Sequence, residues 1–135
     1  MEIAGAFVLV LFLVFVFQHV MIPNDWGRLG IAPRTVTGLI GIVFSPLLHA
    51  SWTHLMANSV PLFVLVFLLF GNRRYEPKVA LTMIWLASGF GTWLIGRGGT
   101  VHVGASSVVF GLVSYLIAAG FLMKSWRAAL IAAVV

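Results

Sequence analysis

Long apolar runs alternate with short polar or glycine- and proline-rich stretches along most of the chain. A run of about 20 apolar residues, at ~1.5 Å rise per residue, matches the ~30 Å hydrocarbon core of a bilayer. The last run holds only eight residues, which is too few to span. The pattern therefore predicts an all-α, polytopic membrane protein with four full transmembrane helices and the start of a fifth, in one domain over residues 1–135. The expected helices are 3–20, 51–70, 79–95, 106–123 and 128–135.

The connection over residues 21–48 has a different pattern. Its apolar residues are interrupted by glycines and prolines, so it is too broken to span the bilayer and too apolar to remain in water. We expect it to lie partly embedded in the membrane interface, with Trp26, Arg28 and Arg34 at headgroup level. Gln18 and His19, at the end of the first helix, are expected at the same interface.

Composition supports the membrane assignment. Hydrophobic residues make up 61% of the chain and charged residues 8%, against roughly 25% charged in soluble domains. The net charge of +5 comes from basic residues in short loops, which favours positive-inside anchoring over nucleic-acid binding. The richer loops, around residues 71–78 and 124–127, are assigned to the cytoplasm, together with the N-terminus. Residues 3–22 lack a preceding basic residue and a cleavage site, so we expect a retained helix.

Polar groups at membrane depth need a physical reason. His54 and Asn58 are four residues apart, about 40° around a helix, so they share one face and suit an oxyanion better than a metal ion. His49 falls outside that face, and a structural role is expected for it. Helical direction places Ser106, in a Gly-x-Ser motif, at the same depth near the outer face.

Helix 106–123 carries a small-residue stripe. Small residues let helices approach closely, and the spacing of four, three and four predicts a central, buried helix. The stripe consists of Ser107, Gly111, Ser114 and Ala118.

A serine hydroxyl needs a base to accept its proton. His49, His54 and His102 are the candidates within the chain, His102 being a weak one because it lies in a glycine-bounded loop. No acidic residue is close to Ser106 in the sequence, so a Ser-His-Asp triad within this chain is excluded. A dyad or an incomplete site remains. The acidic residues of the chain are Glu2, Asp25 and Glu76.

Taken together, the segments 38–49, 49–58 (HASWTHLMAN) and 104–112 (GASSVVFGL) resemble the rhomboid intramembrane serine proteases, whose signature is H-x4-H-x3-N followed by G-x-S. The resemblance implies that Ser106 is the nucleophile and that His54 and Asn58, with the Ser106 backbone N–H, form the oxyanion hole. It also implies that His49 supports a loop and that Gly104 lets the substrate backbone approach.

The resemblance carries three departures. Ser107 stands where the family usually has glycine, and Phe110 stands where many members have tyrosine. The family's general-base histidine is on a sixth helix beyond this chain. We therefore expect residues 1–135 alone to be inactive or nearly so, and the sequence to be a fragment or a truncated product, because losing one member of a catalytic unit costs on the order of 10⁴–10⁶ in rate.

The preferred function is therefore peptide-bond hydrolysis in transmembrane protein substrates near the outer face of a bacterial plasma membrane, without metal or other cofactor and without nucleic acid. One alternative is a non-catalytic rhomboid-like protein that binds membrane helices. The other is a haem or metal protein that uses His49, His54 and His102, for which the spacing provides no facing pair.

Overall fold

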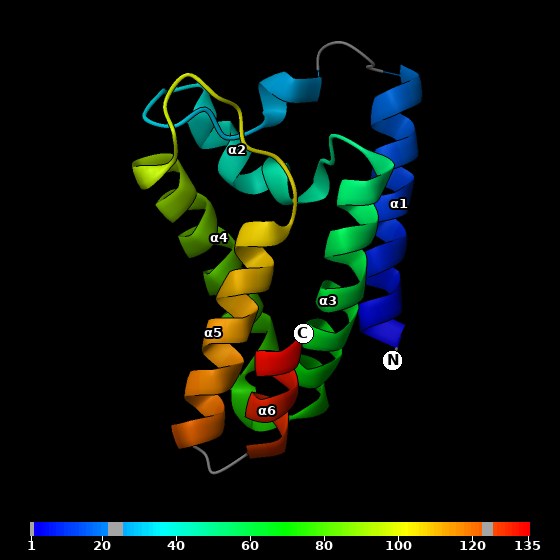
Figure 1. Ribbon diagram of the computed structural model, residues 1–135, viewed down its shortest axis with the longest axis vertical. Coiled ribbons are helices and arrows are strands. Elements are labelled where there is room, and N and C mark those ends of the chain that lie inside the picture. Colours follow the sequence, from blue (N-terminus) through cyan, green and yellow to red (C-terminus); the bar gives the residue numbers. More distant parts are fainter. Residues whose placement is uncertain (1, 22–25, 123–125) are drawn as a thin grey trace.

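The computed structural model describes residues 2–21, 26–122 and 126–135, and in these residues it is helical. The long helices run alternately up and down. The short helix α2 and the segments around it lie at the top of Figure 1, and the N and C labels lie lower down. The elements are α1 (Glu2–Met21), η1 (Trp26–Leu29), α2 (Gly38–Phe44), η2 (Ser45–Leu47), α3 (Trp52–Gly71), η3 (Arg73–Tyr75), α4 (Pro77–Ile95), α5 (Ser106–Leu122) and α6 (Trp126–Val134), where η marks a short 3-10 helix.

Three of the described helices are long and apolar enough to cross a membrane. These are α1, α3 and α4, with 20, 20 and 19 residues and mean hydropathies of 2.5, 1.9 and 1.3. The described part of α5 has 17 residues, and residue 123, which was expected to end it, lies outside the described residues. The all-helical prediction is confirmed, while the count of four full spans stays a prediction.

The core lies between α3 and α5. Leu62 and Leu69 of α3 and Leu112 and Leu116 of α5 are completely buried, and α1 adds Leu11. Each buried face repeats at helical spacing, so the two helices pack along their length. Helix α5 also packs against α4 and α6.

The predicted small-residue stripe is only partly right. An added Cβ at Gly111 would lie 2.6 Å from Cγ2 of Ile84, so this glycine lets α4 and α5 approach closely. Ser114 and Ala118, however, are exposed. The buried residues of α5 are instead Val108, Leu112, Leu116, Ala119 and Gly120. The stripe therefore does not make α5 buried all round.

The connection before α3 folds into a cap, which the sequence pattern did not predict as helical. Helix α2 packs on α4, where Trp85 Nε1 donates to the Val43 carbonyl at 3.1 Å and Gly89 faces Ile42. In this cap the guanidinium of Arg34 donates to the carbonyls of Leu94 and Gly96 at 3.0 and 2.9 Å. Arg34, expected at headgroup level, thus satisfies carbonyl groups at the C-terminal end of α4 that no helical N–H reaches.

Candidate active site

The first turns of α3 carry two of the expected site residues. The helix begins after Ser51, whose hydroxyl accepts from the His54 N–H at 3.2 Å, an ordinary N-cap. One turn later, Asn58 Nδ2 donates to the His54 carbonyl at 3.0 Å. Asn58 is 6% exposed and His54 is half-buried. The prediction that they share a face is confirmed, and one amide hydrogen of Asn58 stays available for another acceptor.

Gly104 brings the loop before α5 directly against these two side chains. Its φ of +108° is a conformation that side chains other than glycine rarely adopt. A Cβ added there would lie 2.5 and 2.6 Å from Cε1 and Nε2 of His54, and 3.5 Å from Nδ2 of Asn58. The backbone of this loop therefore occupies the space beside the His54 ring that any larger residue would fill.

Two backbone contacts hold this loop in place. The Gly104 N–H donates to the Ser45 carbonyl at 2.8 Å, and His102 and Ile31 exchange two backbone hydrogen bonds of 2.9 Å. The cap formed by residues 26–48 thus fixes the loop that leads into α5. The site depends on this cap as much as on the long helices.

Ser106 is the first residue of α5, and its side chain is exposed. Its N–H is among the first four of the helix, which have no acceptor within their own helix and carry the positive end of the helix dipole. Ser106 lines a pocket of about 240 Å³ between α5, α4 and the cap. The lining residues are Ile31, Ser45, Thr92, His102, Val103, Gly104, Ser106, Ser107 and Phe110.

His49 lies behind His54, away from solvent. It is completely buried, its ring centroid is 5.2 Å from that of His54, and both of its ring nitrogens lack a hydrogen-bond partner among the described residues. Burial, and then the charge of His54, lower the pKa of His49 to about 4, and the backbone of Leu47 acts in the opposite direction. His49 is therefore neutral near pH 7, and its ring lies against the His54 ring.

Sequence reasoning missed the role of Gln18. Expected at the membrane interface, it is completely buried, and its side-chain amide donates to the His49 carbonyl and accepts from the His49 N–H. The available signal was that Gln18 is the one side-chain amide of α1, whose residues from Ile3 to Phe17 carry no polar side chain, since buried polar groups require partners.

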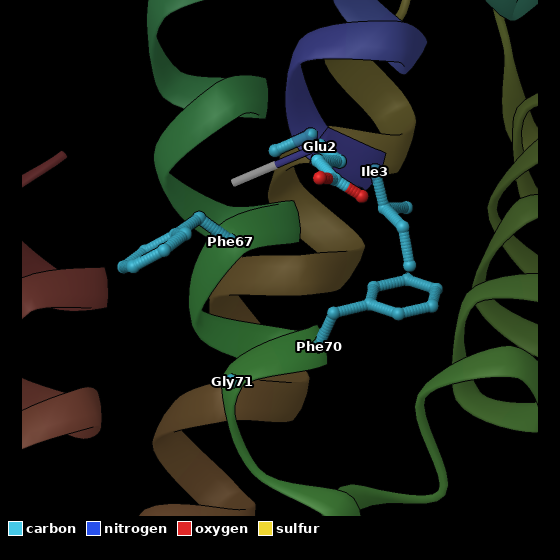
Figure 2. A pocket seen from close by; sticks show the side chains of 6 residues that line it. Glu2, Ile3, Phe67, Phe70 and Gly71 are labelled. Atoms are coloured by element: carbon cyan, nitrogen blue, oxygen red, sulfur yellow. The ribbon is translucent and has the colours of Figure 1, made fainter.

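The remaining ionisable candidates differ in their distance from Ser106. The His102 ring lines the pocket beside Ser106 and pairs with the Thr100 hydroxyl at 3.1 Å, and in the described part of the chain no histidine ring is hydrogen-bonded to the Ser106 hydroxyl. Glu2 lies at the far end of the bundle, in a pocket of about 370 Å³ that Phe67, Phe70 and Gly71 also line (Figure 2). Asp25 lies outside the described residues.

Metal ligation has little support in the described residues, where no group of three or more histidine, cysteine, aspartate or glutamate side chains is placed to hold an ion. His49 and His54 are neighbours, whereas the His102 ring pairs with the Thr100 hydroxyl.

The fold and this site define a polytopic helical membrane protein with a serine, a histidine and an asparagine gathered at one end of two neighbouring helices. The Rhomboid domain model matches residues 36–135, about three quarters of the chain. The chain therefore belongs to the rhomboid family.

Similar proteins come from mycobacteria. Uncharacterized proteins of Mycobacterium bovis and Mycobacterium tuberculosis are 48% identical over 105 residues, which is 72% of this chain and 43% of each relative. An uncharacterized protein of Mycobacterium leprae is 44% identical over 96 residues, 65% of this chain and 38% of the relative. The chain thus spans about two fifths of the length of these relatives. No solved structure matches it.

Proposed function

We propose that the complete gene product is an intramembrane serine endopeptidase of the rhomboid type, with Ser106 as its nucleophile. The observation that carries the proposal is Gly104, whose left-handed backbone touches the His54 ring two residues before Ser106. This contact supports the proposal because the loop that leads into Ser106, at the N-terminus of α5, lies beside two side chains with N–H donors.

The reaction assigns a role to each group. The Ser106 Oγ attacks the scissile carbonyl carbon while its proton passes to a general-base histidine outside residues 1–135. The resulting oxyanion accepts hydrogen bonds from the His54 ring, the Asn58 amide and the Ser106 N–H. The intermediate then breaks the C–N bond, the amine leaves with the proton from the base, and water hydrolyses the acyl-enzyme.

The exposure of Ser106 and the size of the pocket beside it indicate how a substrate could reach the site. Ser106 is exposed, and the adjoining pocket of about 240 Å³ has room for a small side chain. The substrates we propose are transmembrane proteins of a bacterial plasma membrane, cleaved near its outer face, with the N-terminus of this chain in the cytoplasm as its loop charges indicate.

The test is covalent labelling of the complete gene product by a fluorophosphonate probe. The wild type should be labelled and Ser106→Ala should not. Ser114→Ala is the matched control, since Ser114 is an exposed serine of the same helix whose hydroxyl bonds the Phe110 carbonyl. His54→Ala and Asn58→Ala should each slow labelling by ~10²–10³-fold.

Two results would count against the proposal. Equal labelling of the wild type and Ser106→Ala would exclude Ser106 as the nucleophile. A folded wild type that takes no label would favour a non-catalytic protein that binds membrane helices.

A further inference from the structure

We propose that Gln18 of α1 is a positioning residue for the oxyanion hole, acting on His54 through His49. The inference rests on the proposed function and adds a residue of the first helix to it. Gln18 lies outside the motifs that identify the family in this chain, and outside residues 36–135 that the Rhomboid domain model matches.

The first step is the fit between the Gln18 amide and one backbone position. Its Nε2 donates to the His49 carbonyl, and its Oε1 accepts from the His49 N–H at 3.2 Å. Both residues are completely buried. A buried polar group without a hydrogen bond costs free energy. The Gln18 amide, the His49 N–H and the His49 carbonyl would each carry that cost if the His49 backbone moved away from Gln18.

The second step is the transfer from backbone to ring. The His49 side chain is completely buried, so its ring moves with its backbone and with the groups packed around it. That ring contacts the His54 ring edge to face, with centroids 5.2 Å apart. His54 also lies against the backbone of Gly104. The His54 ring therefore contacts both the loop before α5 and a histidine whose backbone is bonded by a residue of α1.

The third step is the entry of α3. His49 lies two residues before Ser51, the N-cap of that helix. A shift of the His49 backbone would therefore displace both a neighbour of the His54 ring and the start of the helix that carries it. A misplacement of about 1 Å at a catalytic group can reduce rate ~10²-fold.

The experiment uses Gln18→Met, which keeps the length of the side chain and removes both hydrogen bonds. Leu11→Ala is the control, because Leu11 is also completely buried on α1, two turns earlier, and is not part of the site. The complete gene product is labelled with ¹⁵N-histidine in micelles, and ring signals are assigned by substitution. Gln18→Met should shift the His49 and His54 signals and leave His102 unchanged, whereas Leu11→Ala should shift neither His49 nor His54.

A kinetic readout accompanies the spectra. Gln18→Met should slow fluorophosphonate labelling of Ser106 by ~10–100-fold. In a His54→Ala background it should cause little further loss, because residues that act through one group are non-additive. A purely structural effect of Gln18 would instead multiply with that of His54→Ala.

The outcomes separate the two proposals. An unchanged His54 signal in Gln18→Met, or the same shift in Leu11→Ala, overturns the positioning role whether or not the protein is an enzyme. A wild type that takes no label overturns the proposed function, and the spectra still decide the positioning role. If Gln18→Met does not fold, Gln18→Glu is measured across its own titration. The protonated carboxyl can make both hydrogen bonds and should leave the His54 signal as in the wild type, whereas the ionised carboxylate cannot donate to the His49 carbonyl and should shift it. A His54 signal that does not follow this titration overturns the positioning role.

Discussion

Replacing Gly104 by alanine tests the contact on which the proposed site depends. The new Cβ would lie 2.5 Å from Cε1 of His54, whereas carbon atoms in contact are ~3.5–4.0 Å apart. The ring or the loop must therefore retreat by about 1 Å. A displacement of this size at a catalytic group corresponds to ~10²-fold in rate. We expect labelling of Ser106 in the complete gene product to slow by about that factor.

A second glycine isolates this steric effect from backbone strain. Gly99 also has a positive φ, +75°, but a Cβ there would meet nothing within 4 Å. Alanine at either position should cost about 1–3 kcal/mol of stability from backbone strain alone. Only Gly104→Ala should also slow labelling, as measured by fluorophosphonate kinetics beside thermal unfolding. Equal losses of labelling rate in the two variants would refute a functional contact between Gly104 and His54.

Two further predictions concern stability. His49 is neutral in the folded protein down to a pKa of about 4 but takes up a proton near pH 6.5 when unfolded, so stability should fall as the pH drops from 6.5 to 4, by up to about 3 kcal/mol. Unfolding of wild type and His49→Phe across that range checks this, and an unchanged slope in the variant would contradict it. Gly111→Ala should destabilise by about 1–3 kcal/mol because its Cβ would lie 2.6 Å from Ile84. Adding Ile84→Ala should recover part of that loss, and additive losses in thermal unfolding would count against close α4–α5 packing.

Much of the architecture was accessible from the sequence. Apolar runs near 20 residues long predicted α1, α3 and α4 to within two residues at each end, because a helix is the structure that satisfies its own backbone in an apolar run. The four-residue spacing of His54 and Asn58 predicted their common face for the same local reason.

Other features depended on contacts that hydropathy does not encode. The connection over residues 21–48 was expected only to lie partly embedded in the membrane interface without spanning it, and the pattern did not show that α2 forms within it and packs on α4. The buried face of α5 includes Val108, Leu112 and Leu116 and so differs from the predicted small-residue stripe, because the packing of α3, α4 and α6 decides which face is covered. Arg34 was assigned from its charge, whereas its position is set by the free carbonyls at the end of α4.

The site shows the same division. The sequence alone identified the candidate residues from their motifs. It also gave the expectation that Ser106 and His54 lie at the same depth in the membrane. Only the tertiary structure brought Gly104 against His54 and Gln18 against His49. The apolar residues of α1 surround the helix on every face. The sequence pattern therefore does not show which face packs against other helices and which faces lipid. The pairing of its one buried amide was therefore decided by a neighbour 31 residues away in the chain.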